Sequence, residues 1–183
     1  MQLRELVERA SHGDHDAFAA VVRANSGRLY AIAYRILRDA DLANDALQEA
    51  LVNVWDDLPA LRDPDRFDSW ATRILCRCSY RVAKRERRAS LPFVANPDSA
   101  TSSAFESEVA DHDEMAGAFR RLSSEHRAVL VLHYYLGMTL SEIAETLSLK
   151  PGTVGSRLHY ATRSLRAALE SEGRSVEARE RPA

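Results

Sequence analysis

The stretch that decides the fold runs from residue 139 to residue 160 and reads TLSEIAETLSLKPGTVGSRLHY. Thr139 and Glu142 have capping-box spacing, which predicts the start of a helix. Pro151 suits the first position of a second helix, because its missing N–H costs nothing there. A short polar turn separates the two helices, so we predict a helix-turn-helix from Thr139 to Arg166.

The second helix of this motif has an apolar stripe on one face and polar and basic side chains on the other. Val154, Leu158 and Leu165 recur at helical spacing, so this stripe should pack inward. The opposite face should carry Ser156, Tyr160 and Arg163, flanked by Arg157, His159 and Arg166. Such a set suits the major groove, with polar side chains on base edges and arginines on phosphates. An ordinary helical hairpin is the alternative, and the short turn, the capping and the basic outer face favour a DNA reader.

The composition is that of an ordinary globular protein. The 183 residues are 45% hydrophobic and 28% charged, with a formal net charge of −2. No run approaches the roughly 18 consecutive apolar residues of a membrane span, and the start lacks the apolar core of a signal peptide. We therefore expect a cytoplasmic protein that does not insert into a membrane.

The sequence contains few patterns that indicate catalysis or metal binding. Cys76 and Cys78 lie two positions apart on a predicted helix, so their side chains diverge by about 160° and cannot share a tetrahedral ion. The sequence has no phosphate-binding glycine loop and no serine or cysteine in a recognisable nucleophile context. Paired acids such as Asp45 and Glu49 could hold a metal, but a contact surface for a basic partner is the better interpretation. We expect no catalysis, no cofactor and no metal, and a metal-dependent enzyme is the least favoured class.

The net charge conceals strong segregation along the chain. Residues 38–57 contain six acids and one base, whereas residues 70–88 contain seven bases and one acid. Residues 98–114 contain six acids and no lysine or arginine. A single charged run is usually a solvated face, but three blocks of alternating sign indicate separate surfaces for separate partners.

Helical periodicity runs through almost the whole chain, and strand signals are nearly absent. Before the helix-turn-helix we expect helices over about residues 3–24 with a break near Gly13, 28–37 after Ser26-Gly27, 39–57, 68–88, 113–122 and 124–136. Residues 59–67 read as a loop with two prolines. The fold class is therefore all-α, with two small helical domains joined by a flexible acidic linker. The predicted units are residues 1–88, the linker over 89–112, the helix-turn-helix domain over 113–170 and a frayed tail over 171–183.

The helix predicted over 68–88 is a second candidate surface for nucleic acid. Its buried stripe on a helical wheel consists of Ala71, Ile74, Cys78 and Val82. A separate face carries Arg73, Arg77, Arg81 and Lys84, with Trp70 and Tyr80 within or beside it. Arginines interleaved with aromatic rings suit single-stranded nucleic acid, in which bases stack and phosphates pair with charge. The alternative for Trp70 is a partly buried core residue.

Together these residues resemble the extracytoplasmic-function (ECF) sigma factors, the minimal two-domain class of bacterial RNA polymerase initiation subunits. The resemblance rests on DALQEA at 45–50 with Trp55, FDSW at 67–70 with Arg73-Ile74, LSSEHRAVL at 122–130, and Thr153-Val154 with SRLH at 156–159. It covers roughly residues 14–168 and is specific in combination, although a helix-turn-helix alone would not be.

The resemblance implies a role for each candidate surface. The acidic helix would bind core RNA polymerase through Asp45, Gln48, Glu49, Val52 and Trp55. The next helix and the loop before it would hold the melted −10 element through Arg66, Phe67, Trp70, Arg73, Arg77, Tyr80, Arg81 and Lys84. The helix-turn-helix would read the −35 element through Thr139, Lys150, Thr153, Ser156, Arg157, His159, Tyr160 and Arg163. Core polymerase and promoter DNA are the implied partners, and the sequence leaves open whether an anti-sigma factor also binds.

The predicted linker is long enough for both domains to reach their DNA elements at once. About 22 residues, from Ala89 to Ala110, span up to about 70 Å when they are extended. Two turns of DNA are also about 70 Å long.

We therefore expect an RNA polymerase sigma factor that directs core polymerase to specific promoters and assists promoter melting. The alternative is a stand-alone helix-turn-helix transcription regulator with an N-terminal sensing or dimerisation domain. The acidic helix, the Trp70 helix and the linker discriminate between the two, because a simple regulator needs none of them.

Overall fold

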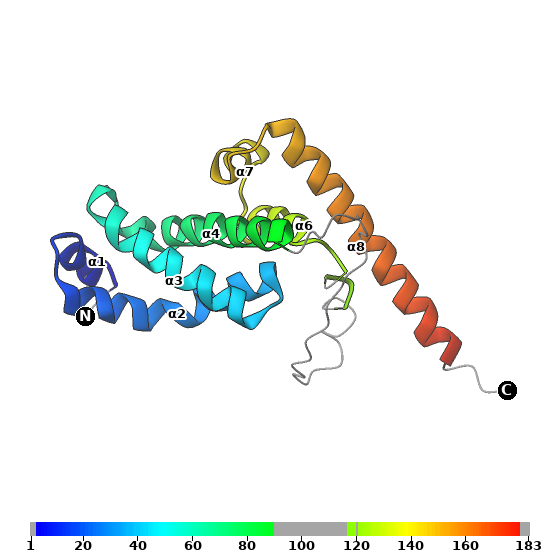
Figure 1. Cartoon of the computed structure of the whole chain (residues 1–183), viewed down its shortest axis with the longest axis horizontal. Coiled ribbons are helices and arrows are strands. Elements are labelled where there is room, and N and C mark those ends of the chain that lie inside the picture. Colours follow the sequence, from blue (N-terminus) through cyan, green and yellow to red (C-terminus); the bar gives the residue numbers. More distant parts are fainter. Residues whose placement is uncertain (1–2, 90–116, 120, 180–183) are drawn as a thin grey trace.

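A computed structural model describes residues 3–89, 117–119 and 121–179, which fold into helices and short turns with no strand among them (Figure 1). The helices are α1 (Leu3–Ser11), α2 (His15–Leu37), α3 (Ala40–Asp57), α4 (Phe67–Ala89), α6 (Ser124–Leu130), α7 (Leu140–Leu147) and α8 (Pro151–Arg179). Two 3₁₀ turns, η1 (Leu58–Ala60) and η2 (Pro64–Arg66), connect α3 to α4, and a π-helical turn, η4 (Val131–Tyr135), follows α6. This confirms the all-α prediction. Within these ranges no helix is long and apolar enough to cross a membrane.

The first predicted helix breaks where expected, but the next predicted boundary is wrong. Gly13 adopts φ +91°, and the Asp14 side chain then caps α2 by accepting a hydrogen bond from the Ala17 amide at 2.9 Å. Helix α2 continues through Ser26-Gly27 to Leu37 without interruption. A glycine inside a helix costs about 1 kcal/mol, which the burial of apolar residues on both sides of Gly27 outweighs.

Helices α2, α3 and α4 pack around an aliphatic core that includes Ile32, Ile36 and Leu75, each 0% exposed. The predicted stripe of α4 is confirmed, because its members are all buried: Ala71, Ile74, Cys78 and Val82. Cys76 is also buried, and burial raises the pKa of its thiol to about 12. This core leaves the opposite faces of α3 and α4 for solvent or partners.

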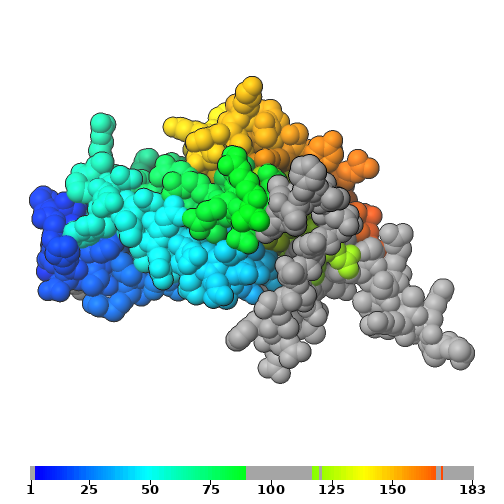
Figure 2. All heavy atoms as spheres, in the orientation of Figure 1, coloured from blue at the N-terminus to red at the C-terminus, as the bar shows by residue number. Residues whose placement is uncertain are grey.

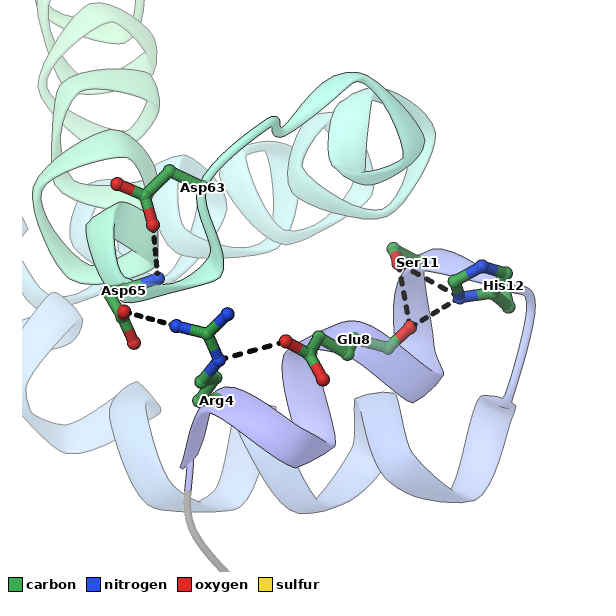
Figure 3. A network of polar contacts seen from close by, with 6 residues as sticks. All are labelled: Arg4, Glu8, Ser11, His12, Asp63 and Asp65. Carbon is green, nitrogen blue, oxygen red and sulfur yellow. Dashed lines mark hydrogen bonds and ion pairs between the residues drawn. The ribbon is translucent and has the colours of Figure 1, made fainter.

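The connection between α3 and α4 is tied to the N-terminal helix. One face of α1 carries apolar side chains that are buried, and the helix contacts α2, η1 and η2. Figure 3 shows Arg4 between Glu8 and Asp65, with its guanidinium donating to both carboxylates. The Asp63 side chain accepts a hydrogen bond from the Asp65 amide at 3.1 Å. The predicted loop is thus a pair of short turns held by α1.

The helix-turn-helix forms as predicted. The Glu142 amide donates to the Thr139 hydroxyl at 3.3 Å, and the Thr139 amide donates to the Glu142 carboxylate at 2.8 Å, which completes the capping box. Ser148 ends α7 in the left-handed region with φ 52°, and α8 begins at Pro151. The facing apolar side chains are buried: Ile143, Ala144, Leu147, Val154 and Ala161.

The remaining predictions concern the linker, the helices beside it and the tail. The predicted linker lies outside the described residues, apart from Ala89 at the end of α4. Of the helix predicted over 113–122, residues 117–119 are described and are helical, and the helix predicted over 124–136 forms as α6 followed by η4. Helix α8 runs to Arg179, past the point at which we expected fraying, because the Ala, Leu and Glu residues at 167–172 are strong helix formers.

The helix-turn-helix domain packs against the first helical domain. Helices α6 and α7 contact α4, and α6 and η4 contact α2. In Figure 2 the yellow atoms around α7 lie directly against the green atoms of α4. The buried apolar residues of the two domains form one continuous core. The sequence predicts a tether between the domains, but it does not predict this interface.

A buried arginine lies at the centre of the interface. The Arg127 side chain donates from Nε to the Ile36 carbonyl at 2.6 Å and from its terminal nitrogens to the carbonyls of Leu37 at 3.2 Å and Leu122 at 2.8 Å. Ile36 and Leu37 end α2, where carbonyls lack partners within the helix. Burial lowers the pKa of the Arg127 guanidinium to about 10, so it stays charged near neutral pH and caps α2.

Candidate nucleic-acid interface

Helix α3 presents an acidic face with an apolar centre. The predicted polymerase-binding residues fall within about 120° of one another around the helix. Asp45, Gln48 and Val52 are exposed, and Val52 is 60% exposed. Trp55 is half-buried, and the His15 ring stacks on it with centroids 4.6 Å apart. An apolar centre with a charged rim is the anatomy of a protein–protein interface, and its acids suit a basic partner.

Helix α4 presents the predicted cationic face. Arg73, Arg77, Arg81 and Lys84 are all exposed beside the half-buried Trp70. The Arg81 guanidinium donates to the Glu49 carboxylate at 2.6 Å and to the Cys78 sulfur at 3.4 Å. The hydrogen bond to Cys78 is the largest cause of a raised pKa for Arg81. Arg81 therefore joins the α3 and α4 faces.

Two aromatic residues of the predicted −10 set are buried. Phe67 is 2% exposed and packs beside Trp70, with ring centroids 6.1 Å apart. Tyr80 is 5% exposed, and its hydroxyl oxygen accepts a hydrogen bond from the Arg157 guanidinium at 2.6 Å. Arg66, by contrast, is exposed on η2 and pairs with Asp63 at 3.4 Å. Phe67 can therefore position Trp70, and neither the Phe67 ring nor the Tyr80 ring is accessible to nucleic acid in this conformation.

Most of the predicted DNA residues of the helix-turn-helix, on α8 and just outside it, are exposed. The exposed members of the predicted −35 set are Thr139, Lys150, Ser156, His159, Tyr160 and Arg163. Tyr160 is 57% exposed and meets the His159 ring edge-on at 5.8 Å. Thr153 is half-buried, and Arg157 points toward α4 instead of outward. The outward row is chemically suited to base edges and phosphates in a major groove.

Two residues of the domain interface, Glu125 and Arg127, lie in the stretch LSSEHRAVL at 122–130 but were given no role from the sequence. Both lie on α6, where Arg127 is 7% exposed and the Glu125 side chain is 14% exposed. Arg127 is three and four residues before the buried Leu130 and Val131, and so lies on the apolar side of its helix. An arginine on the apolar side of a helix was the one feature of the sequence that could have identified Arg127 as an interface residue.

Acid pH is expected to weaken the fold through His126. Burial, followed by the charge of Arg157, lowers the pKa of His126 below its ordinary value of 6.5, and Glu125 opposes this effect. As the pH falls below about 6.5 the unfolded chain binds more protons at this site than the folded chain, so stability decreases. Denaturant unfolding at about pH 7.5 and about pH 5.5 measures the change. Between these pH values His126→Gln should lose less stability than the wild-type chain. An equal loss of stability in the two chains would show that His126 does not cause the pH dependence.

Two family models match the chain, one over each helical domain. Sigma-70 region 2 matches residues 21–89, and Sigma-70, region 4 matches residues 118–167. The ECF RNA polymerase sigma factor SigL of Mycobacterium tuberculosis is 34% identical over 166 residues, which cover 86% of this chain and 93% of SigL. The chain belongs to the ECF sigma factors.

Other relatives agree with this assignment over almost the whole chain. The ECF RNA polymerase sigma factor SigW of Bacillus subtilis is 28% identical over 182 residues, which cover 92% of this chain and 97% of SigW. The solved structure of CnrH in complex with the cytosolic domain of CnrY has a TM-score of 0.57 and 25% sequence identity, and the match covers 92% of this chain and 97% of that chain.

This protein is therefore an RNA polymerase sigma factor that acts in transcription initiation. The region 2 match contains α3 and α4, which a stand-alone helix-turn-helix regulator would not need. No group of three or more metal-ligating side chains is arranged to hold an ion within the described part of the sigma factor.

Proposed function

We propose that three faces of this sigma factor have separate roles in promoter recognition. The acidic face of α3 binds core polymerase, the cationic face of α4 holds the melted −10 element, and the outward row of α8 reads the −35 element. The observation that carries the proposal is the row of exposed cations on α4, which Arg73, Arg77, Arg81 and Lys84 form beside Trp70. Arg73 and Arg81 pair with Glu142 and Glu49, whereas Arg77 and Lys84 have no ion pair to a described residue, so their charges are available to an anionic partner such as DNA.

These roles require binding and positioning but no chemistry. We propose that the chain is a non-catalytic subunit that works in the cytoplasm with the polymerase. A protein partner that controls it is also consistent with CnrH, which is solved in complex with the cytosolic domain of CnrY.

The direct test mixes the purified full chain with core polymerase and fragments of candidate promoter DNA. Co-elution with core polymerase and a transcript that depends on both the sigma factor and the promoter are expected. A chain that neither co-elutes nor supports a transcript would contradict the proposal.

Arg77→Ala is expected to slow promoter opening about five- to tenfold while initial −35 binding changes less than about twofold. Arg77 is exposed on α4 and has no hydrogen bond or ion pair to any residue that the structure describes, so its charge is available to DNA. Loss of one charge-assisted contact of about 1 kcal/mol has this effect on a rate. Permanganate reactivity of unpaired thymines over time measures opening.

Arg23→Ala is the matched control, because Arg23 is an exposed arginine on α2 outside the three faces. It should open promoters at the wild-type rate. If the two variants open promoters equally fast, Arg77 does not contact the melted strand.

A further inference from the structure

An ion pair attaches the turn before α4 to helix α1. The Arg4 guanidinium donates from a terminal nitrogen to the Asp65 carboxylate of η2 and from Nε to the Glu8 carboxylate at 2.9 Å (Figure 3). The charge of Asp65, followed by that of Glu8, raises the pKa of Arg4. Helix α1 also contacts η1 and η2. The turn is therefore held by a helix that precedes the region 2 match.

A second arginine attaches the first turn of α4 to helix α2. The Arg28 guanidinium donates to the Asp68 carboxylate at 3.0 Å and to the Thr72 hydroxyl at 3.1 Å. Thr72 is 0% exposed, and its hydroxyl donates to the Asp68 carbonyl at 2.6 Å. Because the contacts of Arg28 join two helices, a shift of α4 along its axis would break them.

These two attachments flank residues that we propose for the −10 element. Arg66 and Phe67 lie between the two aspartates in the sequence, and Trp70 follows on the first turn of α4. Neither of the attaching arginines belongs to a proposed face. Each arginine can therefore act on the proposed DNA residues only through the aspartate that it holds.

The same arginines neutralise acids that lie next to the proposed DNA residues. Asp63, Asp65 and Asp68 all lie within three residues of Arg66 in the sequence. A carboxylate without a cationic partner would repel the phosphates of a bound strand. Asp63 pairs with Arg66 itself at 3.4 Å, whereas Asp65 and Asp68 pair with the arginines of α1 and α2. The arginines thus fix the position of these two acids and also balance their charge.

We propose that Arg4 and Arg28 are positioning residues that set the selectivity of this sigma factor for the base sequence of the −10 element. The inference rests on the proposed role of α4 and of the turn before it. The two arginines hold residues 65–68 so that the side chains there meet the melted strand in one arrangement. Exposed ion pairs contribute little to stability, but small displacements at a site have large effects on rates. Loss of these pairs should therefore change promoter choice and leave the fold intact.

Arg4→Gln, Arg28→Gln and the double variant test the proposal in the holoenzyme. Each full chain is assembled with saturating core polymerase, and opening rates are measured by permanganate reactivity. The templates are a promoter that gives a transcript in the direct test above and single-base-pair variants of its −10 element. The measured quantity is the ratio of the two opening rates, because a non-specific effect of charge acts on both templates and cancels.

The rate ratio should fall about two- to threefold in each single variant and about tenfold in the double variant. Affinity for core polymerase and for −35 duplex should stay within about twofold of the wild type, with an unchanged unfolding midpoint. Arg28→Lys should retain more selectivity than Arg28→Gln, because an ammonium can still pair with Asp68. In an Asp65→Asn background Arg4→Gln should have no further effect, since its partner is already lost.

Arg9→Gln and Arg23→Gln are the matched controls on the same two helices. Arg9 pairs with Asp14 at 2.6 Å, and Arg23 is exposed on α2, so neither substitution removes a contact to the turn or to α4. Both controls should keep the wild-type ratio, and an equal fall in the controls would overturn the proposal.

Trp70→Ala separates this inference from the proposed function on which it rests. If Trp70→Ala slows opening while the double variant keeps the wild-type ratio, Arg4 and Arg28 do not position the site. If Trp70→Ala has no effect either, the assignment of the −10 element to this face is wrong as well.

Discussion

Val52→Arg is expected to reduce the affinity of this sigma factor for core polymerase roughly 100-fold, as central interface residues are worth about 2–4 kcal/mol. Val52 is 60% exposed between Asp45 and Gln48 on the acidic face of α3. The substitution removes the apolar centre of the face. It also brings a cation toward a partner surface that we expect to be basic. A titration of labelled sigma factor with core polymerase measures the change.

Ala24→Arg is the control for this experiment, because it adds the same charge at an exposed position of α2. Its affinity for polymerase should equal that of the wild type. Both variants should keep the wild-type helical content and unfolding midpoint, since exposed substitutions usually change stability by less than about 0.5 kcal/mol. If Val52→Arg binds polymerase as tightly as Ala24→Arg, another face of the molecule makes the contact.

Arg127→Ala is expected to lower the free energy of unfolding by about 3 kcal/mol, the sum of lost hydrogen bonds and lost charge at a helix end. The side chain is 7% exposed and donates to the carbonyls of Ile36, Leu37 and Leu122. Its removal leaves buried acceptors at the end of α2 without a partner. Urea denaturation followed by circular dichroism measures the loss.

Two further substitutions separate the charge of Arg127 from its geometry. Arg127→Lys keeps a cation near the end of α2 but cannot form the planar fork, so it should lose about half as much stability as the alanine variant. Arg166→Ala removes an exposed arginine from α8 and should change stability by less than about 0.5 kcal/mol. A loss from Arg127→Ala no larger than that from Arg166→Ala would show that the buried guanidinium does not stabilise the interface.

Features that depend on a single helix were predicted well from the sequence. The capping box of Thr139 and Glu142 and the start of α8 at Pro151 involve residues within one turn of each other. The buried stripe of α4 follows from the period of the helix alone. The same period placed the cations of α4 on its exposed side.

Features that depend on neighbours from elsewhere in the chain were not predictable in this way. Gly27 has a low helix propensity, yet α2 continues through it because the helix packs against α1, α3 and α4. A helical wheel of α4 places Tyr80 near the cationic face, but Tyr80 is buried, and its hydrogen-bond partner Arg157 lies 77 positions away in the sequence. The proposed polymerase-binding and DNA-binding residues stay predictions until the variants above are measured.

The stacking of His15 on Trp55 bears on where a fragment of this sigma factor can begin. The region 2 match begins at residue 21, whereas the rings of His15 and Phe18 lie against Trp55 and the buried face of α1 packs on α2. A fragment that starts at the match would uncover apolar surface on α2. It would also remove both ring partners from a proposed polymerase contact. The unit that folds is therefore longer than the stretch that the region 2 model matches, and His15 and Phe18 support the proposed polymerase contact at Trp55.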